Sequence, residues 1–247
     1  METIVKNAVV TGAKQGIGRA VAERLAKEGV NIWACELAAS EEFERDMAEL
    51  SAKYGVWVKP VYFDLADEEQ VKAGAKAIIS EKLPIDILVN NAGIEQQGAF
   101  FQMTPMSSIR RVFDINFFGQ VALTQLITKA MCRRKQGSVV FMSSIAGMDA
   151  TEGYIAYSAS KAAVISAVKT MSAELAQFNV RVNAVAPSAA DTAMFASLTE
   201  KAAENTVNRS FMRRVATTEE IANVIWFLAS DQSSYVTGQV IRADGGM

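Results

Sequence analysis

A tyrosine and a lysine one helical turn apart carry the clearest chemical signal in this sequence. Tyr157 and Lys161 stand at positions i and i+4, a spacing that puts both side chains on one face of a helix. The 247 residues include no histidine, which excludes Ser-His-Asp and Cys-His nucleophiles and zinc sites that rely on histidine. Proton transfer must therefore use Tyr, Lys, Ser, Asp or Glu, and we predict no metal site.

A glycine-rich turn near the N-terminus has the pattern of a phosphate-binding loop. Between an expected strand and an expected helix the chain reads TGAKQGIG, from Thr11 to Gly18. Glycines permit a tight turn and close backbone approach, and the following helix offers unpaired N–H groups and the positive end of its dipole to a phosphate. The position after the first strand and before the first helix is the context that supports this interpretation.

A carboxylate at the end of the expected second strand bears on the choice of cofactor. Glu36 lies 24 positions beyond Gly12, about where a dinucleotide fold places the carboxylate that binds the adenosine ribose. Such a carboxylate would repel a 2′-phosphate, which favours NAD over NADP. Lys14 points the other way, because a cation in the glycine loop could pair with that phosphate. Leu37 is not the Arg or Lys that a 2′-phosphate usually requires, so we predict NAD with NADP as the alternative.

Short apolar runs alternate with longer amphipathic stretches along the whole chain. The pattern predicts strands over 7–11, 30–35, 56–63, 85–90, 138–143, 180–186 and 239–242, and helices over 16–27, 40–53, 67–81, 112–133, 154–177 and 218–229. Such alternation is typical of parallel strands joined by right-handed crossover helices. The strand segments are almost continuously apolar, as expected when helices cover both faces of the sheet. We predict a doubly wound α/β fold of about seven strands.

No repeat or linker divides the chain, so residues 1–247 are expected to form a single dinucleotide-binding domain. The least regular region, about 188–214, is too long for an ordinary loop, and such segments are often lids. It carries the apolar residues Met194, Phe195, Leu198, Phe211 and Met212, which could close over an apolar part of a ligand.

Composition limits the kinds of partner that the protein is expected to bind and the compartment in which it is expected. The formal charge of −2 lacks the basic excess that nucleic acids or anionic membranes require. The longest uncharged stretches, 96–109 and 115–128, have 14 residues each, whereas a spanning helix needs about 20. The first residues show no apolar signal core, and the two cysteines, Cys35 and Cys132, suit a reducing compartment. We expect a cytoplasmic protein that binds neither nucleic acid nor membrane.

Five motifs in this order and spacing resemble those of the short-chain dehydrogenase/reductase family. They are the glycine turn, the Asn90-Asn91-Ala92-Gly93 segment, the Asp114–Gly119 segment with Asn116, the Ser143-Ser144 pair, and the Tyr157–Lys161 pair. The resemblance covers essentially the whole chain and is similar to the single-domain type. It implies a Rossmann-type fold and hydride transfer to or from a nicotinamide cofactor.

The resemblance implies roles for four catalytic residues. Tyr157 would be the general acid in ketone reduction, or the base in alcohol oxidation, and Lys161 would lower its pKa and bind the nicotinamide ribose. Ser144 would hold the substrate oxygen; the family spacing of 13 residues before the tyrosine selects it over Ser143. Asn116 would anchor a water that relays protons to Lys161. Tyr154, which has no lysine at i+4, is expected only to line the substrate pocket.

The same resemblance implies further cofactor contacts. Gly12, Lys14, Gln15, Gly16, Ile17 and Gly18 would bind the pyrophosphate side, and Glu36 the adenosine ribose. Asp64 and Leu65 would meet the adenine ring, while Asn90, Ala92 and Gly93 would line the ribose and the cofactor beyond it. Pro187 and Thr192 would lie beside the nicotinamide together with Tyr157 and Lys161. Ser188 stands where the family usually has glycine after Pro187, which changes the local geometry.

Within the family the chain looks most like the 3-oxoacyl-(acyl-carrier-protein) reductases. A ketone or secondary alcohol is therefore the expected substrate, with a 3-oxoacyl thioester as one form. Arg133, Arg134 and Lys135 could contact an acidic carrier protein, but charges at a helix end are more often simply solvated. Phe178 stands where a second carrier-contacting arginine is expected, and these reductases generally prefer NADPH, which Glu36 disfavours.

Two alternatives remain open at the level of sequence. A dehydrogenase of a polar polyol, sugar or hydroxy acid is the first, since a group of polar residues could line a polar pocket: Glu95, Gln96, Gln97, Asp149, Thr151 and Glu152. They could equally be plain loop residues. A dinucleotide-binding sensor or scaffold without turnover is the second, although a pure binder needs no proton relay.

Relatives in the family are usually tetramers that pair two long helices with their copies in a neighbouring subunit. Here those helices would span 115–133 and 154–177, and the last strand would make a second interface. We therefore expect a homotetramer.

Overall fold

The computed structural model describes residues 5–95, 98–149, 151–196 and 199–247. Its centre is one parallel sheet with the strand order β3-β2-β1-β4-β5-β6-β7. The strands are β1 (Asn7–Thr11), β2 (Asn31–Glu36), β3 (Val58–Tyr62), β4 (Ile87–Asn90), β5 (Gly137–Met142), β6 (Val180–Pro187) and β7 (Val240–Ala243). The predicted doubly wound α/β fold of seven strands is confirmed.

The central strands are mostly apolar because helices cover both faces of the sheet. Successive side chains of a strand point to opposite faces. Accordingly, Val9 of β1 belongs to one apolar cluster, whereas its neighbours Ala8 and Val10 belong to the other. All three are fully buried, which explains why the strand segments read as continuous apolar runs.

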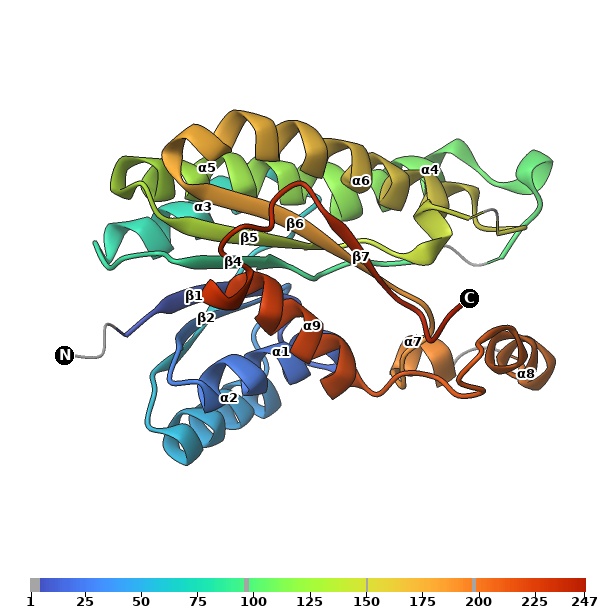
Figure 1. The fold of residues 1–247 in the computed structure, drawn as a ribbon, viewed down its shortest axis with the longest axis horizontal. Helices are drawn as coiled ribbons and strands as arrows, with labels where there is room; N and C mark the ends of the chain where they lie inside the picture. The colour runs from blue at the N-terminus through green and yellow to red at the C-terminus, as the bar shows by residue number, and fades with distance from the viewer. Residues whose placement is uncertain (1–4, 96–97, 150, 197–198) are drawn as a thin grey trace.

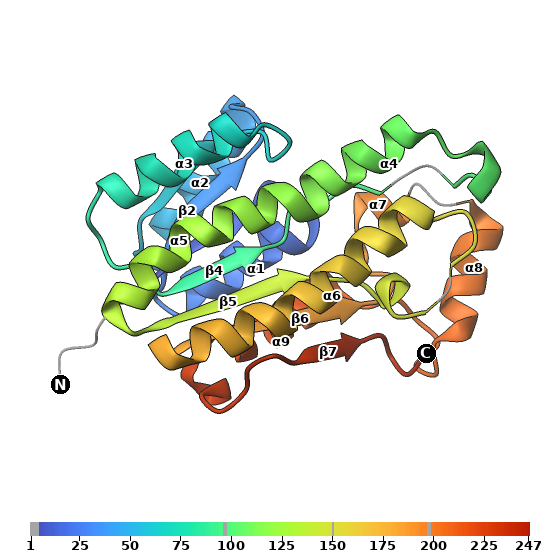
Figure 2. The same cartoon turned by 90° about the horizontal axis from the view of Figure 1, so that it is seen from above.

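Two layers of helices sandwich the sheet (Figures 1 and 2). One face carries α3 (Glu68–Ser80), α4 (Met106–Phe113), α5 (Gln120–Arg134) and α6 (Ile155–Leu175). The other carries α1 (Gly16–Lys27), α2 (Glu41–Tyr54) and α9 (Thr218–Ala229). In the part of the chain that the structure describes, no helix has both the length and the apolar character needed to cross a membrane.

Side-chain caps explain why several helices begin where the sequence predicts. Ser40 accepts a hydrogen bond from Phe43 N, and Asp67 accepts from Glu69 N and Gln70 N, which fixes the starts of α2 and α3. Thr217 and Glu220 form a reciprocal capping box at the start of α9. Most predicted boundaries lie within two residues of the observed ones.

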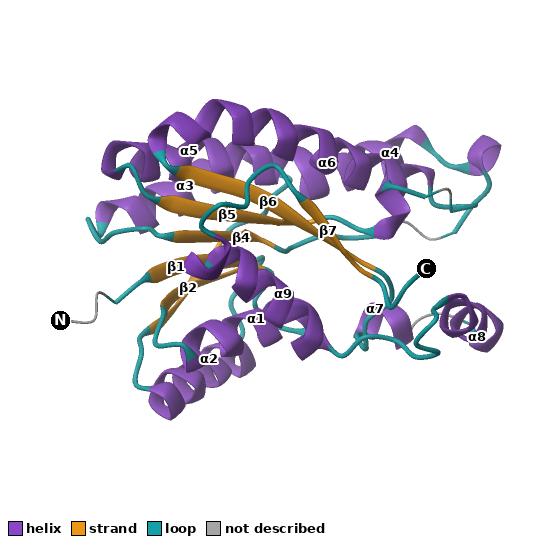
Figure 3. Cartoon of the chain, in the orientation of Figure 1, coloured by secondary structure: helices purple, strands orange, loops and turns teal. Residues whose placement is uncertain are grey.

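Two regions differ from the sequence prediction. The helix expected over 112–133 begins earlier, as α4, and passes through a π-helical turn, Asp114–Gly119, before continuing as α5. The segment expected to be irregular, about 188–214, contains two short helices, α7 (Ala193–Ala196) and α8 (Glu200–Arg209). Figure 3 shows both of them beyond the carboxyl ends of the strands. Apolar periodicity does not distinguish a π turn from an α-helix, and four- and ten-residue helices give little periodicity to detect.

Candidate active site

A cavity of about 670 Å³ opens at the carboxyl ends of the strands. It lies where the strand order reverses between β1 and β4, the point at which open α/β sheets bind their ligands. Its wall includes the glycine turn, Glu36, Asp64, Leu65, Gly93, Ser144, Tyr157, Lys161, Pro187 and Thr192. Residues predicted from separate parts of the sequence thus surround one space.

The glycine turn has a backbone that other residues would not tolerate. Gly12 and Gly16 have φ values of 65° and 54°, in the left-handed region that favours glycine. A Cβ on Gly18 would lie 1.9 Å from the carbonyl oxygen of Gly12, so the first turn of α1 can pack against the loop only with glycine there. Gly12, Gln15, Gly16, Ile17 and Gly18 all line the cavity.

Hydrogen bonds that the sequence analysis did not anticipate hold this turn against β4. Asn91 donates from Nδ2 to the carbonyl oxygens of Thr11 at 3.0 Å and Gly12 at 3.2 Å. The Thr11 hydroxyl accepts from Asn91 N at 3.0 Å and from Ala92 N at 3.1 Å. Gln120 donates to the carbonyl oxygen of Ala92. The doubled asparagine in the sequence was the available signal for Asn91; nothing comparable marked Gln120.

The adenosine end of the cavity carries acidic groups. Glu36 is the last residue of β2 and accepts a hydrogen bond from Leu37 N at 3.0 Å. Asp64 accepts from Ala66 N at 2.8 Å and lies 3.6 Å from the guanidinium of Arg111, a cavity residue on α4 that the sequence analysis missed. Lys14 is not among the cavity residues, because its ammonium lies 3.2 Å from the Glu42 carboxylate.

Lys161 is a buried cation at the centre of the site. Its side chain is 2% exposed, and Nζ donates to the carbonyl oxygen of Met142 at 2.8 Å. Burial disfavours the charged form and lowers the pKa of Lys161 to about 8. Nζ also lies 5.6 Å from the centre of the Tyr157 ring, as the i, i+4 spacing predicts.

Tyr157 keeps its proton at neutral pH in the structure as it stands. Burial raises the pKa of the phenol to about 12, partly offset by a hydrogen bond with Ser144 and increased by the charge of Glu95. Ser144 itself lies just after β5, where its hydroxyl also accepts from Ala146 N at 3.2 Å. Ser143 instead donates to the backbone carbonyl of Lys161 at 3.0 Å, consistent with choosing Ser144 as the substrate-binding serine.

Asn116 lies in the π-helical turn, a feature often found at functional sites. Its amide nitrogen donates to the carbonyl oxygen of Ile94 at 2.8 Å and to the Ser160 hydroxyl at 3.1 Å, and its Oδ1 accepts from Ile94 N at 2.9 Å. Asn116 Oδ1 and Lys161 Nζ lie 3.2 and 3.4 Å from the point where a Cβ on Gly93 would sit. Asn116 and Lys161 therefore both lie close to Gly93, where a side chain would crowd them.

The side chain of Asn90 points away from the cavity wall. It is fully buried and donates to the Thr124 hydroxyl on α5 at 2.8 Å. Ala92 and Gly93, two and three residues further along the chain, line the cavity. Asn90 thus fixes the end of β4 below the cofactor site.

The substrate half of the cavity mixes apolar and polar groups. Met194 and Phe195 of α7, Tyr154, Thr151 and Glu95 line it. Phe211 and Met212 point outward, with exposed fractions of 82% and 61%, and Leu198 lies outside the described residues. Of the described apolar residues named in the predicted lid, those of α7 therefore line the cavity and those after α8 do not.

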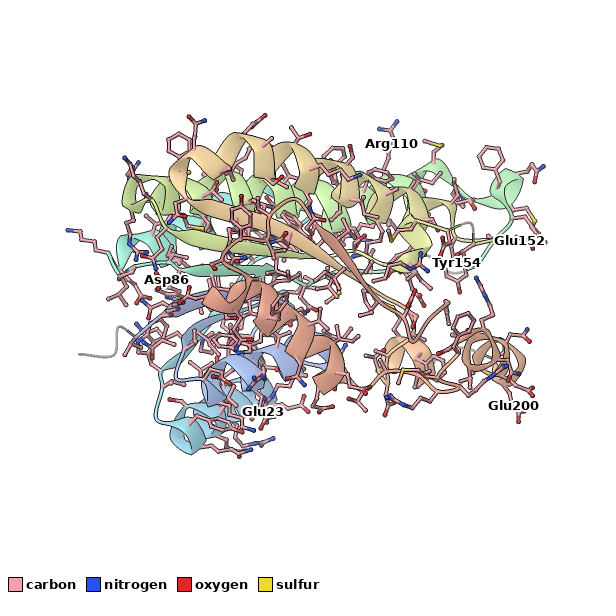
Figure 4. All side chains as sticks on the ribbon, viewed as in Figure 1. Glu23, Asp86, Arg110, Glu152, Tyr154 and Glu200 are labelled. Carbon is pink, nitrogen blue, oxygen red and sulfur yellow. The ribbon has the colours of Figure 1, made fainter. Side chains whose placement is uncertain are left out.

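Other polar residues considered for the pocket have different positions. Asp149 forms an ion pair with Arg242 at 2.9 Å, which ties the loop after β5 to the end of β7. Glu152 is exposed and is not a cavity residue; Figure 4 shows it near Tyr154 at one end of the molecule. Gln96 and Gln97 lie outside the described residues.

The residues present fit a nicotinamide dinucleotide. Gly16 opens the first turn of α1, where unpaired N–H groups suit a pyrophosphate, and a Cβ there would meet the Thr192 methyl at 3.2 Å. The carboxylates of Glu36 and Asp64 stand at one end of the cavity and Tyr157 and Lys161 at the other. Within the described ranges, no group of three His, Cys, Asp or Glu residues could hold a metal ion.

Comparisons with known proteins agree with this geometry. The family model described as enoyl-(acyl carrier protein) reductase matches residues 12–247. The chain is 39% identical over 242 residues to the 3-oxoacyl-(acyl-carrier-protein) reductase of Thermotoga maritima, covering 98% of this chain and 97% of that protein.

Solved structures extend the similarity. A 3-oxoacyl-(acyl-carrier protein) reductase with bound NAD from Brucella melitensis aligns with a TM-score of 0.90 and 30% identity, covering 98% of this chain and 90% of that one. An NAD⁺-bound xylitol dehydrogenase aligns equally well, with a TM-score of 0.90 and 30% identity over 98% of each chain. A further aligned structure carries NADP at low occupancy, so the relatives include binders of both cofactors.

Proposed function

The chain belongs to the short-chain dehydrogenase/reductase family, and from this premise we propose that it interconverts a ketone and a secondary alcohol with NAD(H) as its cofactor. The observation that carries the proposal is that Ser144, Tyr157 and Lys161 line one cavity together with the glycine turn, while Asn116 and Lys161 both lie close to Gly93 on its wall. A bound nicotinamide supplies or accepts the hydride, and the protein supplies orientation and the proton.

Tyr157 is the proposed acid. In ketone reduction it donates its proton to the carbonyl oxygen, which Ser144 holds by hydrogen bonding. The raised pKa of Tyr157, about 12, keeps that proton in place at neutral pH until the substrate oxygen gains charge. Lys161, with its positive charge on the same helix face, favours the phenolate that remains. Lys161 and Asn116 both lie close to Gly93, and a water that they hold between them would replace the proton.

NAD rather than NADP is the proposed cofactor. Glu36 ends β2 at the cavity wall, where its carboxylate would accept hydrogen bonds from the ribose and repel a 2′-phosphate. Lys14, the nearby cation that could pair with such a phosphate, already forms an ion pair with Glu42. Tighter binding of NADPH than of NADH to the unaltered protein would contradict this assignment.

The substrate class to test first is a 3-oxoacyl thioester, which the names of the curated relatives suggest. We expect NADH to be consumed faster than NADPH at equal concentration. Tyr157→Phe should lower turnover by at least about 100-fold, the usual contribution of a general acid, while cofactor affinity changes little. Tyr154→Phe is the matched control, because Tyr154 lines the same cavity without a lysine one turn away. Retained turnover in Tyr157→Phe would contradict the assignment of Tyr157 as the general acid.

The wider setting is proposed on the same basis. Both cysteines are free, which suits a reducing cytoplasm. An acyl carrier protein is a possible partner if the substrate is a carrier-bound thioester. A dinucleotide-binding sensor without turnover is the competing function, and NADH consumption with any ketone would exclude it.

A further inference from the structure

Glu95 is a carboxylate on the cavity wall that the proposed chemistry does not use. It follows β4 and the Asn-Asn-Ala-Gly segment, two residues beyond Gly93, and it is half-buried. In the described part of the chain its side chain forms neither an ion pair nor a hydrogen bond, whereas 13 ion pairs involve other carboxylates. A partly desolvated carboxylate without a partner is costly, and a ligand that donates to it recovers that cost.

Glu95 lines the same cavity as Ser144, Tyr154 and Tyr157. Its negative charge acts on both Tyr154 and Tyr157, and it raises the pKa of each phenol. Burial in turn raises the pKa of Glu95 itself. With the substrate oxygen on Tyr157 and Ser144, as proposed above, Glu95 is a carboxylate on the wall of the same cavity that a substituent on the neighbouring carbon could reach.

Other charged groups of the cavity do not neutralise Glu95. Arg111 lies at the adenosine end beside Asp64, at 3.6 Å. Lys161 points to the Met142 carbonyl at 2.8 Å, and Arg209 of α8 lines the cavity without lying within 4.0 Å of a described carboxylate. Among the described side chains that line this cavity, the titratable or charged groups besides Glu95 are those of Cys35, Glu36, Asp64, Arg111, Tyr154, Tyr157, Lys161 and Arg209.

We propose that Glu95 is a specificity-determining residue that selects ketones bearing a hydroxyl on the carbon next to the carbonyl, and the corresponding vicinal diols. The hydroxyl donates a hydrogen bond to the carboxylate while the carbonyl oxygen binds Tyr157 and Ser144. A carboxylate at the same position is repelled, and a plain methylene leaves Glu95 desolvated and unpaired. The inference rests on the proposed hydride-transfer function but favours a hydroxylated substrate over a 3-oxoacyl thioester, whose carbons next to the ketone carry no donor.

Three small ketones that differ at one position test this inference. Hydroxyacetone, acetone and pyruvate share a methyl ketone and differ in carrying a hydroxymethyl, a methyl or a carboxylate group. Reduction of hydroxyacetone consumes one NADH and one proton and yields propanediol. We expect kcat/KM for hydroxyacetone to exceed that for acetone by roughly 10- to 100-fold, the usual effect of a hydrogen bond to a charged group, and pyruvate to be the poorest of the three.

Glu95→Gln isolates the charge. This variant should bring the three kcat/KM values closer together, chiefly by raising the value for pyruvate and the KM for hydroxyacetone. It should also shift the pH dependence of propanediol oxidation to lower pH, since loss of a nearby negative charge lowers the pKa of Tyr157. Glu152→Gln makes the same change in charge at a nearby exposed carboxylate outside the cavity and should leave the preference unchanged.

The outcomes separate the inference from the proposed function. An unchanged order of the three ketones in Glu95→Gln overturns the role of Glu95, whatever the absolute rates. If no ketone or thioester is reduced, the proposed function fails. Calorimetric titration of hydroxyacetone and acetone into the NAD-saturated protein then decides the inference alone. Preferential binding of hydroxyacetone that is lost in Glu95→Gln supports it, and equal or undetectable binding of both overturns it.

Discussion

At the scale of single residues, the site depends on a lysine that is costly to bury. Lys161 has 2% exposure and a pKa lowered from 10.5 to about 8 because burial disfavours its charge. Among the described residues, the only hydrogen bond from its Nζ goes to a neutral backbone carbonyl, that of Met142. Lys161 therefore reduces the stability of the fold near neutral pH in exchange for a positive charge beside Tyr157.

The free energy that burial of the Lys161 charge costs depends on pH, because the pKa of Lys161 differs between the folded and the unfolded chain. Below about pH 8 Lys161 is protonated in both the folded and the unfolded chain, so the full cost of burying the charge is present. Between pH 8 and 10.5 the unfolded chain binds more protons at this residue, and stability rises with pH. Each unit of pKa difference corresponds to about 1.4 kcal/mol, which makes the whole effect about 3 kcal/mol.

Lys161→Met should therefore change the pH dependence of stability. Relative to the unaltered protein, the free energy of unfolding of this variant should fall by up to about 3 kcal/mol between pH 7 and pH 10.5, because only the unaltered protein gains from losing the charge. Denaturant unfolding of the cofactor-free proteins across this range measures the difference. Lys169→Met, at an exposed position of the same helix, should show no such trend. A constant difference across the range would show that Lys161 pays no burial cost.

A second prediction at the scale of single residues concerns Gly93. A methyl group there would lie 3.2 Å from Asn116 Oδ1 and 3.4 Å from Lys161 Nζ, the two groups proposed to hold a relay water. Gly93→Ala should lower kcat by roughly 10-fold or more through loss of the proton relay. The free energy of unfolding should change by less than the activation free energy does. Gly98→Ala is the control, since its nearest neighbour, a Tyr154 ring carbon, is 4.0 Å away. An unchanged kcat in Gly93→Ala, checked by single-turnover measurement of the proton-dependent step, would show that no proton relay passes between Asn116 and Lys161.

At the scale of elements, sequence patterns predicted the helix bounds that local interactions determine. α1 and α9 match their predicted bounds, because glycine or a capping box marks their first residues and apolar periodicity marks their length. The π-helical turn was not predicted, although it is what brings Asn116 to Ile94 and Ser160. Glu95 was named only as one of several polar loop residues. Its lack of a partner follows from tertiary packing, which no local pattern records.

The glycine turn and α1 act as one unit, and Gly18 is the point at which they meet. Gly18→Ala would place a Cβ 1.9 Å from the Gly12 carbonyl and 2.4 Å from Asn91 Nδ2, so the loop would have to move. We expect the dissociation constant for NADH to rise at least about 10-fold, because displaced N–H groups no longer meet the pyrophosphate.

Gly29→Ala separates this effect from general backbone strain. Gly29 has a positive φ of 76° but nothing within 4 Å of an added Cβ. That variant should lose about 1 kcal/mol of stability and keep its affinity for NADH. Fluorescence titration with NADH measures both variants, and equal affinities for Gly18→Ala and the unaltered protein would contradict the packing argument.

At the scale of the whole molecule, the sheet order brings distant motifs together. β1 and β4 are neighbours although 75 residues lie between the end of β1 and the start of β4. The reversal of strand order between these two strands opens the cavity. The outer face of α5 and α6 lies on the surface of the subunit, on the side shown in Figure 2. Exposed apolar side chains occur at the start of this layer, including Phe118 at 57% exposure, with its ring 5.4 Å from that of Phe117.

Contiguous exposed apolar surface often marks a protein interface. We predict a homotetramer in which α5 and α6 pair with their copies, so light scattering should give about four times the subunit mass of 26.7 kDa. Phe118→Asp would bring a carboxylate into that contact and should yield smaller assemblies at the same concentration, because an unpaired charge is costly to bury. Far-ultraviolet circular dichroism controls for the fold of the variant. A monomeric mass for the unaltered protein would refute the tetramer, and a tetrameric mass for Phe118→Asp would place the interface on another face of the subunit.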